Sequence, residues 1–305
     1  MDVSSHMRYR ILHETAYEYA SEVLHAHHIL HLVPRPAPFQ QCVEHTISVE
    51  PAPYRRRDSV DAFGNALTRI EFEHPHRRLD VVTEMEVDVY PRPKVFAAHS
   101  VPWERLSAEL AYHGAWPTRE NLEACRFRHE SPYVRVKQEF TDYAAECFPA
   151  GCPMLDCADA LMVKLHRELK YAPGETTVRT PVREVLKNRR GVCQDFSHLM
   201  IACLRSRGLA ARYVSGYLRS GPVRSNASPE SPAIGAGASH AWVAVYIPPF
   251  GWLEFDPTNN VLVGTGHVAV AWGRDFGDVS PLHGVILGGA THELKVSVDV
   301  ECVTQ

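Results

Sequence analysis

The stretch GVCQDFSHLMIACLRSRGLAARYVSGYL, residues 191–218, places a cysteine in the first turn of a predicted amphipathic helix. Gly208 is expected to end this helix. The apolar stripe of the helix consists of Phe196, Leu199, Met200, Cys203 and Leu204. Cys193 lies outside the stripe, where the free N–H groups of a helix start favour a negatively charged sulfur. The pattern leaves Cys193 open as a small packed side chain, a metal ligand or a nucleophile.

A hairpin further along the chain offers the partners that a nucleophilic cysteine needs, a base and a group that orients the base. SHAWVAVYIPPFGWLEFDPT, residues 239–258, predicts two strands joined by a short turn. If Ile247 pairs with Gly251 across a three-residue loop, Asp256 becomes the diagonal neighbour of His240 on one face. A loop with an even number of residues would place the two side chains on opposite faces.

The composition is that of an ordinary soluble globular protein. Of the 305 residues, 45% are apolar and 22% are charged, with a net charge of -4. We therefore expect neither nucleic-acid binding nor membrane association, and no apolar run approaches the ~18 residues of a membrane span. Residues 1–6 resemble a cloning junction, and the N-terminal region lacks the apolar core of a secretion signal. Eight cysteines spread through a long chain then predict a cytoplasmic protein with reduced thiols.

Changes in periodicity divide the chain into three parts. Residues 7–95 show the alternation typical of strands and are expected to form a β-rich N-terminal domain. Residues 105–262 combine predicted helices, one of them within 131–148, with further strands, and form the predicted catalytic core. Residues 263–305 are expected to be a strand-bearing C-terminal extension.

The two motifs resemble the core of the bacterial transglutaminase-like superfamily. The resemblance includes LKYAPGETTVRTPVREVLKNRRGVC, which leads into the cysteine motif. YRILHETAYEYASEVLHAHHILHLVPRP, residues 9–36, is similar to the β-rich domain that precedes this core in one bacterial branch. AWGRDFGDVSPLHGVILGG, residues 271–289, is similar to the C-terminal segment of that branch. The resemblance implies an α+β fold with a papain-like core, in which a nucleophile helix packs on an antiparallel sheet.

The same resemblance assigns a role to each motif residue. It implies that Cys193 is the nucleophile, that His240 is the general base, and that Asp256 orients the imidazole. The implied substrate is a protein or peptide amide, whose acyl-enzyme is hydrolysed or transferred to an amine, and no cofactor is expected. Family members that act on proteins often have a tryptophan upstream of the nucleophile. Residues 117–192 contain none, which favours hydrolysis or a restricted acyl transfer.

Two side chains near the motif are expected to line the substrate cleft. Gln194 follows the nucleophile, and Trp242 shares a strand face with His240, although plain core packing is the alternative for Trp242. The charged segment 274–278 is expected to hold the C-terminal tail by charge pairing rather than to bind substrate. The loop 219–239, rich in Gly, Ser and Pro, is open to two roles, as a lid or as a linker.

Spacing argues against a metal site. Cys147, Cys152 and Cys157 lack the two-residue gaps that zinc sites usually have. His25 and His27 share a strand face, which a solvated surface explains without a metal.

Two rival functions stay open. One is a cysteine peptidase or glycopeptide amidase built on the same core, and the other is a catalytically silent peptide-binding module. An intact Cys-His-Asp set argues against the silent module. The sequence predicts neither the oligomeric state nor the purpose of the N-terminal domain.

Overall fold

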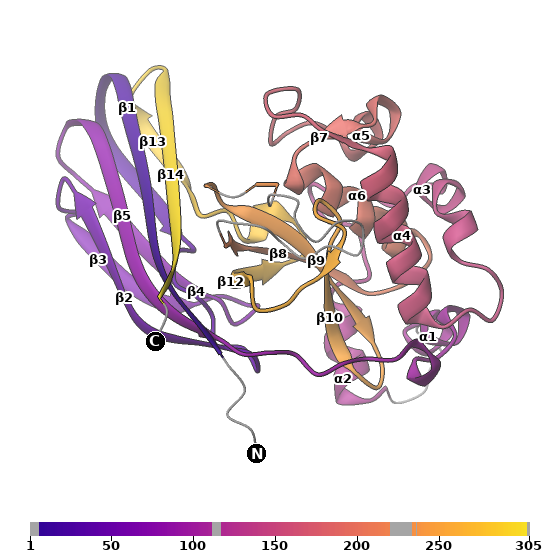
Figure 1. The fold of residues 1–305 in the computed structure, drawn as a ribbon. Coiled ribbons are helices and arrows are strands. Elements are labelled where there is room, and N and C mark those ends of the chain that lie inside the picture. Colours follow the sequence, from indigo (N-terminus) through magenta and orange to yellow (C-terminus); the bar gives the residue numbers. More distant parts are fainter. Residues whose placement is uncertain (1–5, 112–116, 220–233, 236, 304–305) are drawn as a thin grey trace.

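The computed structural model describes residues 6–111, 117–219, 234–235 and 237–303, which form two large β-sheets and a helical layer (Figure 1). The architecture is α+β, as the sequence predicted. One sheet lies at the left of Figure 1, the second lies in the middle, and most helices lie on the right. Within the described residues, none of the helices is both long enough and apolar enough to cross a bilayer.

The N-terminal sheet is organised around one long strand, β1 (Met7–Leu30). Its other strands are β2 (Gln40–Glu50), β3 (Arg55–Val60), β4 (Ala66–Phe72), β5 (His76–Val89), β13 (Leu282–Gly288) and β14 (His292–Val303). The strand order is β2-β5-β1-β4-β3, and β13 and β14 also pair with β1. The last two strands of the chain therefore return to the first domain, so residues 263–305 do not form a separate unit.

The helical layer covers one face of the second sheet. Its elements are η1 (Ala97–His99), α1 (Trp103–Glu109), α2 (Arg119–Cys125), α3 (Gln138–Tyr143), η2 (Ala145–Cys147), α4 (Met154–Glu168), α5 (Val182–Asn188) and α6 (Cys193–Ser206), with the short parallel strands β6 (Lys170–Tyr171) and β7 (Arg190–Gly191). The helix predicted within 131–148 is shorter than expected. Ser131 and Val134 exchange backbone hydrogen bonds of 2.9 and 3.2 Å, which close a tight turn, and α3 begins only at Gln138.

The second sheet, here called the core sheet, carries the predicted site. Its strands are β8 (Ala211–Leu218), β9 (His240–Ile247), β10 (Gly251–Asp256), β11 (Val261–Leu262) and β12 (His267–Gly273), and η3 (Phe276–Asp278) follows β12. The order is β11-β10-β9-β8-β12, and α6 packs against β8 and β9. Ile247 pairs with Gly251, so the hairpin has the three-residue loop that the predicted site requires.

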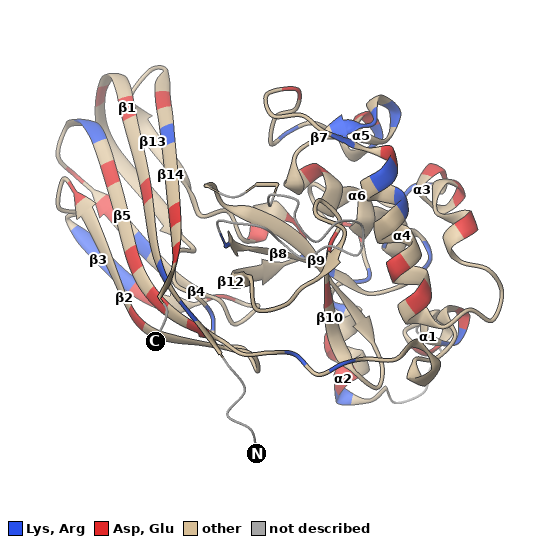
Figure 2. Cartoon of the chain, viewed as in Figure 1, with Lys and Arg blue, Asp and Glu red and all other residues tan. Residues whose placement is uncertain are grey.

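Charged residues follow this division into layers (Figure 2). Acidic and basic side chains are interspersed along β1, β3 and β5 of the N-terminal sheet, and β2 carries acidic ones, whereas β9 and β12 of the core sheet carry neither kind. Every residue of β9 is buried. Both faces of β9 are therefore enclosed. A side chain that shares a face of β9 with His240 is not exposed to solvent for that reason alone.

Three buried histidines make the folded state sensitive to acid. Burial lowers the pKa of His13 and of His28 to about 4, and that of His198 to about 3. Nε2 of His198 also accepts the N–H of Phe276 at 3.1 Å, which only a neutral ring can do.

Lowering the pH from about 7.5 to about 5 is expected to destabilise the fold by several kcal/mol, about 2 kcal/mol for each of these histidines. The unfolded chain binds a proton at each histidine near pH 6.5, whereas the folded chain binds it only near the lowered pKa, so stability falls as the pH falls through this window. Urea unfolding at both pH values measures the loss. His28→Leu removes a ring whose nitrogens have no hydrogen-bond partner within the described residues. This variant should lose about 2 kcal/mol less stability between the two pH values than the unmodified protein. Equal stability at both pH values would contradict the prediction.

Candidate active site

Cys193 is the first residue of α6 and is partly exposed. The turn before it is fixed by Asp195, whose carboxylate accepts the N–H of Val192 at 2.8 Å and the hydroxyl of Thr176 at 2.6 Å. The N–H of a first helical residue has no partner within the helix. Cys193 therefore lies at the start of the helix, where the sequence placed it, and its own N–H has no partner within α6.

Position 191, two residues before Cys193, is occupied by glycine for a steric reason. A Cβ at position 191 would lie 2.5 Å from Oδ2 of Asp195 and 2.6 Å from its Cβ. A side chain there would displace Asp195 from Val192 and disturb the start of α6. Gly191 thus permits the close approach that holds the cysteine turn in place.

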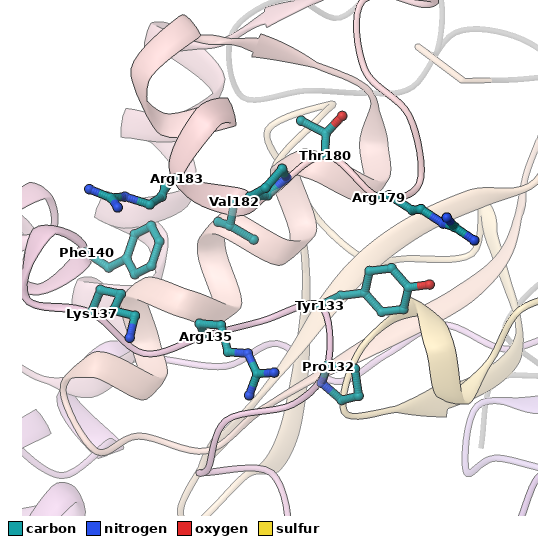
Figure 3. A pocket seen from close by; sticks show the side chains of 10 residues that line it. Pro132, Tyr133, Arg135, Lys137, Phe140, Arg179, Thr180, Val182 and Arg183 are labelled. Atoms are coloured by element: carbon teal, nitrogen blue, oxygen red, sulfur yellow. The ribbon is translucent and has the colours of Figure 1, made fainter.

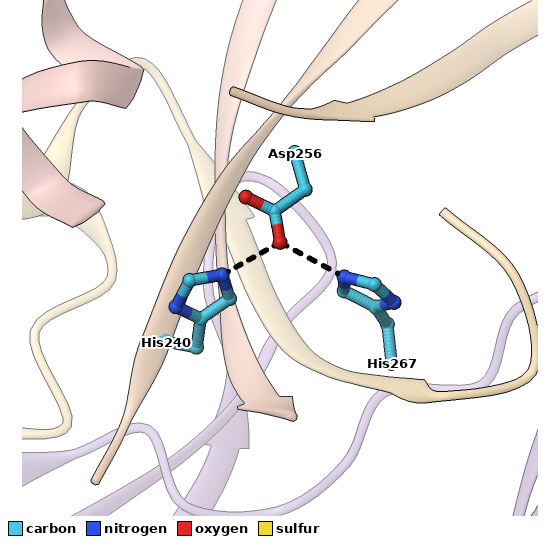
Figure 4. Close-up of side chains that lie close together, drawn as sticks. All are labelled: His240, Asp256 and His267. Carbon is cyan, nitrogen blue, oxygen red and sulfur yellow. Dashed lines mark hydrogen bonds and ion pairs between the residues drawn. The ribbon is translucent and has the colours of Figure 1, made fainter. Parts of the chain in front are cut away.

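His240 and Asp256 face each other from adjacent strands (Figure 4). His240 is the first residue of β9, and Asp256 is the last residue of β10. Nε2 of His240 lies 2.8 Å from Oδ2 of Asp256, and both side chains are fully buried. Because a carboxylate only accepts hydrogen bonds, Nε2 of His240 carries the hydrogen. The hairpin register brings the two residues together as the sequence predicted.

Asp256 accepts hydrogen bonds at both of its oxygens. Oδ2 receives bonds from His240, from Nε2 of His267 at 3.1 Å and from the side-chain amide of Asn259 at 2.8 Å. Oδ1 receives the backbone N–H groups of Thr258 at 3.0 Å and Asn259 at 3.2 Å. Burial is the largest single influence and would raise the pKa of Asp256, but His240 and His267 together hold it far below its ordinary value. The carboxylate is therefore ionised.

The charge of Asp256 acts in turn on His240. Burial alone would lower the pKa of His240, but Asp256 and then Cys193 raise it to about 10. His240 is therefore an imidazolium at neutral pH. Its contribution to stability is complete below the ordinary pKa of 6.5 and is lost as the pH rises towards 10.

Cys193 lies close enough to the same imidazole to contribute to the raised pKa of His240. Nδ1 of His240 makes no hydrogen bond of regular geometry within the described residues. Hydrogen bonds between catalytic groups are often long or poorly aligned before substrate binds. Gly235 lies over this edge of the ring, where a Cβ would come within 2.8 Å of Nδ1. The structure thus brings all three predicted residues together at one end of the core sheet.

Two segments of the chain match known families. Residues 9–88 match the bacterial transglutaminase-like N-terminal region, and residues 142–257 match the transglutaminase-like superfamily. An uncharacterized protein of Mycobacterium tuberculosis is 36% identical over 308 residues, which cover 98% of this chain and 94% of that protein. The chain belongs to the transglutaminase-like superfamily.

Other similar proteins are more distant. An uncharacterized protein of Mycobacterium leprae is 30% identical over 294 residues, which cover 96% of this chain and 98% of that protein. A protein-glutamine gamma-glutamyltransferase of Pseudomonas aeruginosa is 29% identical over 109 residues, 33% of this chain and 16% of that protein. The crystal structure of a Cytophaga hutchinsonii protein, provisionally named a cysteine protease, superposes with a TM-score of 0.73 at 20% identity, over 99% of this chain and 92% of that one. This likeness shows the shared fold, a papain-like core with a β-rich N-terminal domain.

The two predicted substrate contacts occupy different environments in this transglutaminase-like core. Gln194 is partly exposed, and its amide donates to the carbonyl of Val178 at 3.4 Å, which braces the segment before α5. Trp242 is fully buried, and its indole N–H donates to Glu254 at 2.8 Å. Trp242 thus makes the contacts of core packing, the alternative that the sequence left open for it.

The charged segment after β12 makes the structural contacts that its sequence favoured. Nη2 of Arg274 lies 2.8 Å from Oδ1 of Asp278. Asp275 is fully buried and accepts the N–H groups of Tyr133 at 2.8 Å and Gly277 at 2.9 Å. These bonds fix η3 beside the loop that precedes α3.

Sequence reasoning missed His267 and Asn259 as partners of Asp256. Asn259 directly follows the quoted motif, three residues after Asp256, and this short spacing is a signal that could have suggested a hydrogen bond between the two side chains. His267 opens a strand predicted only as tail material, and no local spacing connects it to the site. The ligand atoms of His240, Asp256 and His267 lie within 4.8 Å of one another, a proximity for which their hydrogen bonds already account.

A separate cavity of about 270 Å³ lies between the loop before α3 and the start of α5 (Figure 3). Phe140 and Val182 form part of its wall, and the charged ends of Arg135, Arg179 and Arg183 point away from one another. None of the three predicted catalytic residues lines it. The diverging cations do not form a single site for an anion.

Proposed function

We propose that this chain is a cysteine-dependent enzyme that forms an acyl-enzyme at Cys193 from a protein or peptide amide and releases the acyl group mainly to water. The observation that carries the proposal is the buried 2.8 Å hydrogen bond from His240 to Asp256, with Cys193 interacting with the same ring. A nucleophile, a base beside it and a carboxylate that orients the base are the parts that acyl transfer from an amide requires. Membership of the transglutaminase-like superfamily supports the same chemistry.

In the proposed first step, the thiolate of Cys193 attacks the carbonyl carbon of the amide, and the carbonyl electron pair moves to oxygen. We assign the N–H of Cys193, at the start of α6, as the donor that stabilises this oxyanion, because it has no partner within the helix. The imidazolium of His240 then gives its proton to the departing amine as the C–N bond breaks. This leaves a thioester at Cys193 and a neutral His240.

In the second step, neutral His240 accepts a proton from water, which attacks the thioester and displaces the thiolate as the free acid forms. The imidazolium and thiolate are restored together. An amine acceptor would follow the same route and yield a new amide. The absence of tryptophan from residues 117–192 supports water as the main acceptor.

Product analysis tests the proposed function. The protein is incubated with a pool of glutamine-containing peptides, with and without a small primary amine, and the products are identified by mass spectrometry. We expect free-acid products that persist when the amine is present and that disappear in Cys193→Ala. Cys42→Ala, which removes another partly exposed thiol, is the matched control and should leave the yield unchanged. No product that depends on Cys193 would contradict the proposal, and amine-linked product alone would overturn the preference for water.

A further inference from the structure

His267 is a second imidazole on the carboxylate that holds His240. Its Nε2 lies 3.1 Å from Oδ2 of Asp256, and only 3% of the residue is exposed (Figure 4). Burial lowers the pKa of His267, which outweighs the opposite effect of Asp256. His267 is therefore neutral, and it donates the hydrogen of Nε2 without bringing a second positive charge to the site. The ring of Trp242 packs edge-on against it, with centroids 5.2 Å apart.

The strand that begins with His267 is the edge of the core sheet nearest the N-terminal domain. Among the described strands of the core sheet, β12 pairs with β8 alone. The other edge of β12 contacts side chains of the N-terminal domain instead of another strand of the core sheet. The place of His267 therefore depends on contacts between the two domains.

Three residues of the N-terminal domain bind the backbone around His267. The hydroxyl of Tyr9 donates to the carbonyl of Thr265 at 2.9 Å. The side-chain amide of Gln40 donates to the carbonyl of Ala269 and accepts its N–H, both at 2.7 Å.

Asn65 makes the same paired contact with Trp272, at 2.9 and 3.0 Å. Gln40 and Asn65 are buried, so each amide replaces the hydrogen bonds that a neighbouring strand would supply. Contacts from Tyr9 and Gln40 lie on either side of His267 in the sequence.

We propose that the N-terminal domain is a positioning element of the active site: Gln40 fixes β12, and β12 holds His267 against Asp256 so that the carboxylate faces His240. His267 and Gln40 are positioning residues, because neither touches the reacting atoms. The inference rests on the proposed function of Cys193, His240 and Asp256. Small displacements of an orienting group reduce rates strongly, because the base must stay aligned with the nucleophile.

Alkylation of Cys193 by iodoacetamide at neutral pH tests the inference without knowledge of the natural substrate. His267→Phe is expected to slow alkylation about tenfold or more, because the donor to Asp256 is lost. His267→Gln, which retains an N–H donor, should recover most of the rate. Gln40→Leu is expected to slow alkylation about threefold to thirtyfold. Gln41→Leu, at the exposed neighbouring position, is the matched control and should have no effect.

A double-mutant cycle shows whether Gln40 acts through His267. The variant with both Gln40→Leu and His267→Phe should react no more slowly than His267→Phe alone, because the same alignment is already lost. Near-ultraviolet circular dichroism checks folding, and Gln40→Glu, which keeps the shape but loses the donor to Ala269, serves if Gln40→Leu fails to fold. The inference is overturned if the rate reductions of the two single variants multiply in the double variant. It is also overturned if the folded single variants are alkylated as fast as the unmodified protein. If Cys193 of the unmodified protein reacts no faster than Cys42, the proposed function itself fails.

Discussion

Replacing Asp256 with asparagine is expected to lower amide turnover about 1,000- to 10,000-fold. Within the described residues, Asp256 accepts five hydrogen bonds, three at Oδ2 and two at Oδ1, and donates none. An asparagine has only one acceptor oxygen. If that oxygen faces His240, its NH2 group meets the backbone N–H groups of Thr258 and Asn259. If it faces them instead, the NH2 group meets Nε2 of His240 and forces the ring into the other tautomer.

The rate of product formation from the peptide pool measures this loss. Asp299→Asn, at an exposed position on β14, is the matched control and should leave the rate unchanged. Turnover within about tenfold of the unmodified protein would mean that Asp256 does not orient the base.

Replacing Arg205 with methionine is expected to destabilise the fold by about 3–5 kcal/mol. Arg205 is 3% exposed, in the last turn of α6, and burial lowers its pKa to about 10. Its guanidinium donates to the carbonyls of Phe127, Ala211 and Arg274 at 2.9, 2.8 and 2.6 Å, and to the hydroxyl of Ser131 at 3.1 Å. Methionine fills a similar volume but removes all of these donors, and the carbonyl of Phe127 then retains only the N–H of Ala211 at 3.2 Å among the described contacts.

The midpoint of urea unfolding, followed by far-ultraviolet circular dichroism, measures the loss. Arg167→Met removes an exposed guanidinium from α4 and should change stability by no more than about 0.5 kcal/mol. A similarly small change in Arg205→Met would show that the buried guanidinium is not needed to join α6 to β8 and to the segment after β12.

The part of the site that the sequence predicted is the part encoded by local spacing. The position of Cys193 follows from the glycine and the apolar stripe of its helix, and the pairing of His240 with Asp256 follows from one hairpin. The three-residue loop between Ile247 and Gly251 fixes that register within a few residues. The resemblance to the transglutaminase-like superfamily joined these two local patterns, which are separated in the sequence by a strand and the loop 219–239.

The rest of the site depends on contacts that no local pattern encodes. His267 reaches Asp256 because β12 pairs with β8, which lies about fifty residues earlier in the chain. The return of β13 and β14 to β1 joins opposite ends of the sequence. Alternation along a strand predicts which face Trp242 occupies but not whether that face is covered, so the sequence left both the cleft and the core open for this residue. Most of the predicted loop 219–239 lies outside the described residues, so its role as a lid or a linker stays a prediction.

The central claim, that Cys193 is a nucleophile activated by His240, is tested most directly by mapping thiol alkylation. The protein and its His240→Ala variant are treated briefly with iodoacetamide at neutral pH, and each of the eight cysteines is quantified by peptide mass spectrometry. The account predicts that Cys193 reacts first in the unmodified protein and at least about tenfold more slowly in His240→Ala, while Cys42 is unaffected. Cys193 reacting no faster than Cys42, or equally fast without His240, would contradict it.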